Sequence, residues 1–206
     1  MPRMVSFRGE GRRSYSKTTW HHHYLVSLGR NAYIMTETSR HTLDRFFSGT
    51  VDDKMHVMDN MYNHHGRQLL ADETVTVSLA LLKEYAAELS AHMQAMNLGP
   101  LCSNCASRTG GGCCSSYMEA NSDAALLLIN RLYGINVTRQ HEDSTDCCFL
   151  GQSGCILPIK PMFCLNYNCK HISDQATKKE MDDLEQLAGR LLTEQTRLES
   201  ILLHIL

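Results

Sequence analysis

Apolar residues recur at helical spacing on both sides of a cysteine-rich middle region. The clearest repeat lies between Asp72 and Met96, and it predicts one long helix. The apolar stripe of this helix consists of Val77, Leu81, Tyr85, Leu89 and Met93. The sequence Leu98-Gly99-Pro100 should end the helix, because Gly suits the position after a helix and Pro cannot continue one.

The same spacing predicts three shorter helices. Residues 38–48 form the first, and a second starts near Asp52 and ends at Gly66. The third fills residues 124–133 and is closed by Gly134. These segments place helical structure before and inside the cysteine-rich region.

A long helix is predicted from about Ser173 to the end of the chain. Leucine or isoleucine recurs every seven residues in it, at Leu184, Leu191, Leu198 and Ile205. Glu194 interrupts a second apolar row on the same helix. At roughly 1.5 Å per residue the helix would be about 50 Å long. It should pack antiparallel on the 72–96 helix, with pairing to a second copy of the chain as the alternative.

These elements define the expected fold. With 206 residues, 43% of them hydrophobic, the chain can form one domain with appended helices. The predicted fold class is mainly α, a helical bundle wrapped around an irregular cysteine-rich metal-binding segment. The expected regions are a basic arm (1–30), an N-terminal helical region (31–100), a cysteine-cluster segment (101–171) and a C-terminal helix (172–206).

All nine cysteines fall within a third of the chain, a distribution that packing in a hydrophobic core would not produce. The N-terminus shows no secretory signal, which predicts a cytosolic location where thiols stay reduced. An odd number of cysteines also fits complete disulfide pairing poorly. The pattern therefore predicts metal ligands. The predicted ligands are Cys102, Cys105, Cys113, Cys114, Cys147, Cys155, Cys164 and Cys169, with Cys148 as an additional candidate.

The spacing of these cysteines suits either zinc or an iron–sulfur cluster. Cys102 and Cys105 are separated by two residues, which lets both sulfurs face one point. Cys113 and Cys114 should point apart if the chain is extended there, so that one of them serves a given metal. Pro161 and the nearby Pro158 should exclude helix from the later part of the segment. Spacing alone does not separate iron from zinc, whereas the surplus of thiols favours a cluster.

Residues 101–171 resemble the YkgJ-type cysteine-cluster proteins, which are described as zinc- or iron-chelating. The likeness rests on the C-x2-C pair, the double cysteine, Cys147 before Phe149-Leu150, Gly154-Cys155, Lys160-Pro161 before Cys164, and the final Cys169. The departures are a longer spacing from Cys105 to Cys113, Cys148 in place of proline, Lys160 in place of arginine, Leu165 in place of a basic residue, and Asn168 in place of proline. The resemblance implies a bound metal and a more distant similarity to the cysteine-rich part of flagellin lysine methylases.

Charge and motifs narrow the function classes. The net charge of −2 gives no general attraction to nucleic acid or membrane. Residues 1–30 carry six bases and one acid, and this arm or the helices could dock a protein partner. No nucleophile elbow, phosphate-binding loop or His-Glu-x-x-His pair points to a stand-alone enzyme. The sequence thus favours an iron–sulfur protein with an electron-transfer, redox-sensing or maturation role. The alternatives are a structural zinc module that binds a partner, and a methylase-like enzyme.

Overall fold

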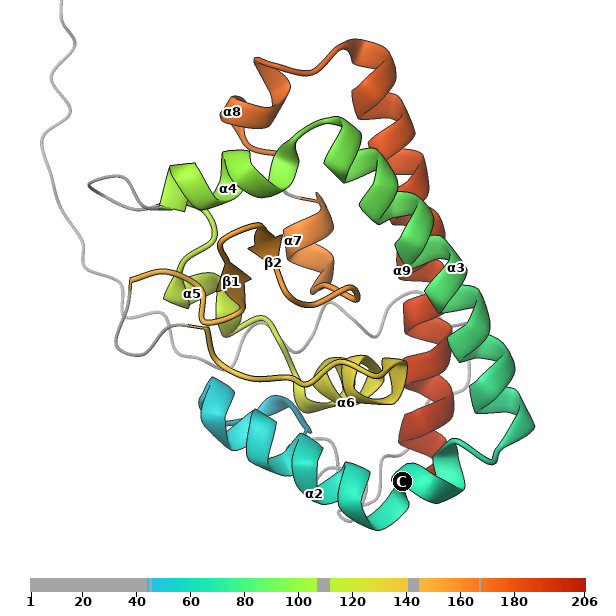
Figure 1. Cartoon of the computed structure of the whole chain (residues 1–206). Coiled ribbons are helices and arrows are strands. Elements are labelled where there is room, and N and C mark those ends of the chain that lie inside the picture. Colours follow the sequence, from blue (N-terminus) through green and yellow to red (C-terminus); the bar gives the residue numbers. More distant parts are fainter. Residues whose placement is uncertain (1–43, 45, 107–111, 141–144, 167) are drawn as a thin grey trace, which may run out of the picture. The chain divides into compact units, whose positions relative to one another are not determined.

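The computed structural model of the chain describes residues 44, 46–106, 112–140, 145–166 and 168–206. The described chain is mostly helical, as predicted, and its one sheet is a two-stranded hairpin (Figure 1). The elements are α2 (Val51–Leu69), α3 (Glu73–Ala95), α4 (Leu98–Ala106), α5 (Ser116–Glu119), α6 (Ala124–Tyr133), β1 (Leu150–Gly151), β2 (Gly154–Cys155), α7 (Met162–Asn166), α8 (Lys170–Ser173) and α9 (Lys178–Ile205). The basic arm at 1–30 and most of the helix predicted at 38–48 lie outside the described residues.

Helix α2 starts where the sequence predicts and ends later. Thr50 caps it, since the Asp53 backbone N–H donates to the Thr50 hydroxyl and the Thr50 N–H donates to the Asp53 carboxylate. The prediction that the helix ends at Gly66 is wrong, because α2 continues to Leu69. Gly66 is buried against the Tyr62 ring, where a Cβ atom would lie 3.1 Å from a ring carbon. Close packing thus accounts for a glycine inside this helix.

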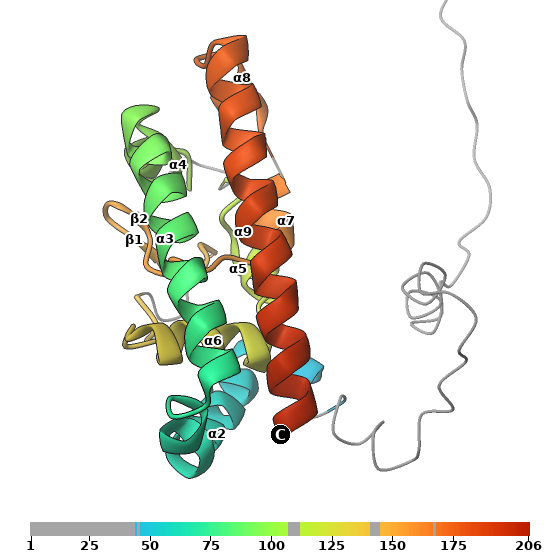
Figure 2. The ribbon, with the colours of Figure 1, turned by 90° about the vertical axis from the view of Figure 1, so that its right-hand side faces the viewer.

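Helices α3 and α9 lie side by side in opposite directions along much of their length (Figures 1 and 2). The buried face of α3 matches the predicted stripe at Leu89 and differs from it at Val77, which is 51% exposed. The difference arises because buried Ser78 lies on the contact face and donates a hydrogen bond to the buried carboxylate of Glu194 on α9. A pattern of apolar residues cannot reveal a stripe that contains a polar pair.

The start of α9 is also corrected by the structure. The helix begins at Lys178, with Thr177 and Glu180 forming a capping box. Ser173, the predicted start, instead ends the separate short helix α8. The heptad positions predicted for α9 are buried at Leu184, Leu191 and Leu198.

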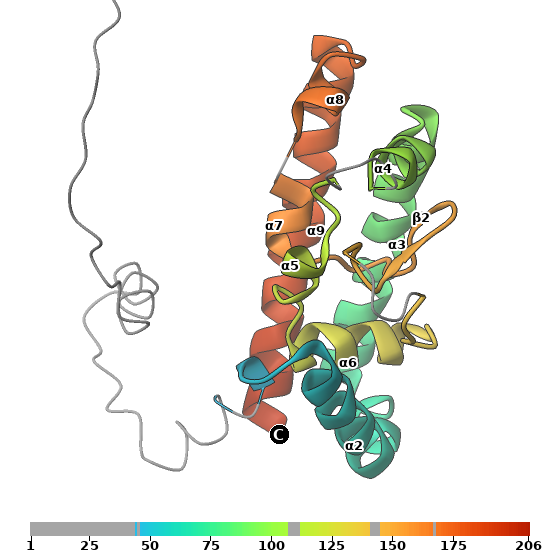
Figure 3. The same cartoon turned by 90° about the vertical axis from the view of Figure 1, so that its left-hand side faces the viewer.

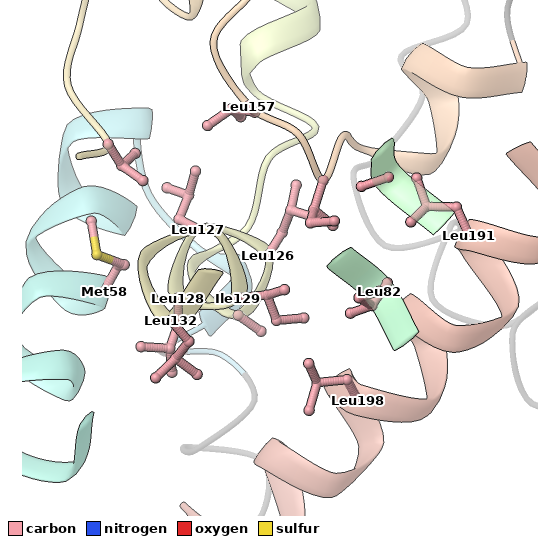
Figure 4. Packing of buried hydrophobic residues seen from close by; sticks show 14 of the residues in the cluster. Met58, Leu82, Leu126, Leu127, Leu128, Ile129, Leu132, Leu157, Leu191 and Leu198 are labelled. Carbon is pink, nitrogen blue, oxygen red and sulfur yellow. The ribbon is translucent and has the colours of Figure 1, made fainter. Parts of the chain in front are cut away.

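Helix α6 forms the centre of the hydrophobic core and has the predicted bounds. Its seven residues 124–130 are all buried, between α2 on one side and α9 on the other. Asp123 caps its start by accepting the Leu126 N–H, and Gly134 ends it with a φ of 109°. Figure 4 shows side chains of α2, α3, α6 and α9 packed together around this helix.

Two prolines start helices that the sequence did not predict. Leu98-Gly99-Pro100 opens α4 two residues after α3, and the second of these residues, Asn97, has a φ of 55°. Likewise, α7 follows Pro161 directly, and the Pro161 carbonyl accepts the Cys164 N–H at 2.9 Å. The predicted end of the 72–96 helix before Gly99-Pro100 is confirmed, since α3 ends at Ala95. The prediction that Pro161 excludes helix is wrong, because proline is well accommodated at the start of a helix, where its missing N–H is not needed. Among the described helices, none has the length and hydropathy needed to cross a membrane.

Candidate metal centre

Six of the nine cysteines line two adjoining cavities beside the α3–α9 pair. The cavities have volumes of about 100 and 70 Å³. Their lining residues come from α3, α4, α5, α7, α8, α9 and the β-hairpin, elements whose arrangement is shown in Figures 1 and 3. The larger cavity is lined by Cys102, Cys114, Cys147, Cys155 and Cys164, and the smaller by Cys102, Cys113, Cys114 and Cys164. The thiols of Cys102, Cys114 and Cys164 therefore line both cavities, as do Met93 and Met118.

The two pairs of adjacent cysteines behave differently. Cys113 and Cys114 both line the smaller cavity, contrary to the prediction that they point apart. The reason is that the chain turns there, with the Ser115 N–H donating to the Cys113 carbonyl at 3.0 Å. Cys147 lines the larger cavity, whereas Cys148 is buried and held by a carboxylate of α5. Neighbouring cysteines can therefore share a site only where the backbone bends.

Three predicted ligands lie outside the cavity walls. Cys105 and Cys169 are half-buried, and the Cys169 thiol is in hydrogen-bonding contact with that of Cys113. Cys148 donates its backbone N–H to the Glu119 carboxylate at 2.7 Å. This contact directs Cys148 toward α5 and away from the thiols of the cavities. All nine cysteines are free thiols in the described structure.

A close glycine contact joins α4 to the β-hairpin. A Cβ atom on Gly99 would lie 2.3 Å from the Ser153 carbonyl oxygen, so that only glycine fits at this position. Gly154, with a φ of 110°, forms the facing surface. The Ser103 hydroxyl adds a hydrogen bond of 3.0 Å to the Gly151 carbonyl. Together these contacts place Cys102 of α4 opposite Cys155 of β2.

A second set of contacts joins the early cysteines to the late ones. The Cys147 N–H donates to the Cys114 carbonyl at 3.0 Å, and Ser115 forms a β-bridge with Asp146. The Glu119 carboxylate, which binds the Cys148 N–H, also lies 3.8 Å from the Arg139 guanidinium. Residues more than thirty positions apart in sequence are thereby held side by side.

A third contact fixes the segment before α7. Asn130 of α6 is fully buried and its amide bonds the backbone of Ile159 twice, donating to the carbonyl at 2.8 Å and accepting the N–H at 3.1 Å. Lys160 follows at once and lines the larger cavity. The hydrophobic core thus determines where Lys160 and Cys164 lie.

Contacts among the thiols change their acidity. The Cys114 thiol lowers the pKa of Cys113 to about 6 by hydrogen bonding to its thiolate form. The pKa of Cys114 is raised, because its proton is shared with Cys102 and Cys113. Burial raises the pKa of Cys147 to about 11. At neutral pH the group therefore holds at least one thiolate, the form that binds metals.

The donor set fits a soft metal. The residues lining the cavities include six cysteines and two methionines, and no histidine or carboxylate. Within the described residues, no three Cys, His, Asp or Glu side chains are gathered closely enough to hold a single ion. Thiolates must lie about 2.3 Å from one zinc ion, whereas a cluster of several irons bridges thiolates that lie farther apart.

Several residues of this site were not predicted from the sequence as parts of it. These residues are Met93, Ser103, Met118, Glu119, Asn130 and, as a cavity-lining cation, Lys160. Met93 carried the one usable signal, since it lies on the apolar face of α3 that reaches the cysteine segment. Three residues near the cysteines in sequence could also have served as ligands or proton donors: His141 and Glu142 lie outside the described residues, and His171 is exposed.

Comparisons with family models, curated proteins and solved structures found no match for this chain. The likeness to YkgJ-type cysteine-cluster proteins therefore stays a prediction from the residues of the cysteine segment.

Proposed function

We propose that this protein holds a metal–thiolate centre in the two adjoining cavities, and that the centre is an iron–sulfur cluster. The observation that carries this proposal is the convergence of six cysteines on cavities without a lining histidine or carboxylate. These lining residues include no carboxylate ligand of the kind that a hard cation such as Mg²⁺ or Ca²⁺ prefers. A bound cluster supplies one-electron chemistry, which suits electron transfer, redox sensing or a maturation role.

The cysteines have graded roles in this proposal. Cys102, Cys114 and Cys164 line both cavities and are the ligands that any occupant would use. Cys147 and Cys155 complete the set in the larger cavity. Cys148, bound to Glu119, serves to hold the chain beside Cys147.

A structural zinc site is the second candidate. The smaller cavity is lined by four thiols, the number that a closed zinc site requires, and these thiols would have to move closer together to bind one ion. In that case the metal would complete the fold of the cysteine segment, and the helices would carry the function by binding a partner.

Anaerobic purification followed by a visible spectrum and analysis of iron, zinc and sulfide separates the candidates. A broad visible charge-transfer band with iron and labile sulfide supports the cluster. A colourless protein with stoichiometric zinc supports the structural site. A protein that binds neither metal after reconstitution contradicts both.

The neighbouring variants Cys147→Ser and Cys148→Ser provide a matched test of the ligand assignment. Loss of metal from the first variant, with retention by the second, is the expected result. Equal metal contents in both variants would contradict the assignment of Cys147.

A further inference from the structure

Lys160 is the one charged residue among the described residues that line the two cavities. It shares the wall of the larger cavity with Cys102, Cys155, Cys164 and two other cysteines. The remaining lining residues are cysteines, apolar side chains, an asparagine and glycines, with no other basic residue and no carboxylate. A single ammonium group thus belongs to a compartment of thiols and apolar groups.

The position of Lys160 is fixed from both sides. Ile159, before it, is fully buried and bound twice by Asn130. Pro161, after it, is buried and starts α7. With its backbone held at both neighbours, the half-buried Lys160 has a limited range in which to place its side chain.

No described carboxylate forms an ion pair with Lys160. An ammonium group that is partly removed from water requires an opposite charge nearby. The cavity offers this charge once several of its thiols have become metal-bound thiolates. Four thiolates around a divalent ion, or around a cluster core of equal charge, leave an excess of two negative charges.

We propose that Lys160 is the counter-charge of an anionic metal–thiolate complex in this cavity and that it determines how readily the complex accepts an electron. This inference rests on the proposed function and adds to it a residue that sets the reduction potential of the centre. Adding an electron increases the negative charge of a cluster, and a fixed cation beside it favours that state. For a redox-inert zinc centre, the same cation strengthens metal retention.

The test compares Lys160→Met and Lys160→Arg with wild type and with Lys178→Met, which removes an exposed lysine at the start of α9. Iron, sulfide and zinc are measured first, and the midpoint potential of an iron-loaded protein is then found by dye-mediated titration. The expected result is a more negative potential for Lys160→Met, with values near wild type for Lys160→Arg and Lys178→Met. If the metal is zinc, Lys160→Met should lose it severalfold more readily to a chelator.

The outcomes separate the two proposals. A wild-type protein that takes up neither metal overturns the proposed function, and this inference with it. A metal-loaded protein in which Lys160→Met matches wild type in potential or zinc retention overturns the role of Lys160 alone. If Lys160→Met folds poorly, Lys160→Gln removes the same charge and keeps a polar side chain. A potential or zinc retention of Lys160→Gln equal to that of Lys160→Arg would then overturn the role of Lys160.

Discussion

The four long helices and the cysteine segment are held together in different ways. Helices α2, α3, α6 and α9 have 10 to 28 residues each and bury a shared apolar core. The elements that carry the cysteine segment, apart from α6, have 2 to 9 residues. The segment adds Phe149, Leu157, Ile159 and Leu165 to the same apolar core. Glycine contacts and single hydrogen bonds complete its positioning around thiol-lined cavities.

This difference indicates a division of tasks. The helical core is filled by its own apolar side chains, so it should fold without any ligand. The cysteine segment, in contrast, surrounds the two thiol-lined cavities. Its full stability should therefore depend on what binds there. The following changes test this distinction, beginning with the largest expected effect.

Truncating the helical core should cost the most. Leu191 of α9 is fully buried, and Leu191→Ala should lower the free energy of unfolding by about 3 kcal/mol, since it leaves a cavity. Val77→Ala on the exposed side of α3 should change it by less than about 0.5 kcal/mol. Urea unfolding of the metal-free protein measures both. Similar losses for the two variants would contradict the assignment of the buried face.

The polar pair in the α3–α9 contact should have an intermediate effect. Ser78→Ala removes the hydroxyl donor to the buried carboxylate of Glu194 and should cost about 2 kcal/mol. Replacing both partners, with Ser78→Ala and Glu194→Leu together, should restore much of this loss, because no buried charge is left without its donor. A double-mutant cycle measures the coupling. Additive losses would show that the pair does not act as a unit.

Stability should also depend on pH through Glu199. Burial, with a contribution from the charge of Asp123, raises the pKa of Glu199 to about 7 from a usual value of 4.5. Between these values the folded protein retains a proton that the unfolded chain releases, so the free energy of unfolding should fall as pH rises from about 4.5 to 7.

Glu199→Gln should remove about 1–2 kcal/mol of this fall. Unfolding curves of the metal-free protein at pH 5 and pH 7.5 provide the measurement. Glu185→Gln, at an exposed position of the same helix, serves as the control. The same pH dependence in Glu199→Gln and wild type would refute the assignment.

The smallest global effect is expected for the link between the two halves of the cysteine segment. Glu119→Ala removes the acceptor of the Cys148 N–H and a partner of Arg139. Global stability should change by about 1 kcal/mol or less, while the Cys148 amide should exchange hydrogen faster. Amide exchange combined with urea unfolding measures the two effects. A large global loss with unchanged local exchange would contradict a local role.

The helices were predictable to the extent that apolar spacing and helix ends define them. Residues 124–133 were predicted with their observed bounds because a continuous apolar run ends in a glycine of positive φ. The start of α4 at Leu98 and of α7 after Pro161 were missed, since proline at a first helical turn and proline in a loop look alike in sequence. The first turns of the buried face of α3 were assigned to Val77 in place of Ser78, because a serine is expected at the surface.

The candidate site was predictable as a group and unpredictable in detail. Clustering of cysteines in sequence identified the segment, and six of them line common cavities. Which member of Cys147-Cys148 turns inward depends on Glu119, and the placement of Lys160 depends on Asn130 of a core helix. Such contacts between distant residues leave no local pattern in the chain.

Hydrogen exchange of the metal-free and metal-loaded protein tests the central claim most directly. If the helical core folds without metal and the cysteine segment depends on it, amides of α3, α6 and α9 should be strongly protected from exchange in both forms. Amides of residues 145–166 should exchange readily in the metal-free protein and become protected when metal is bound. Loss of protection in α3 and α9 on metal removal, or unchanged exchange at 145–166, would contradict it.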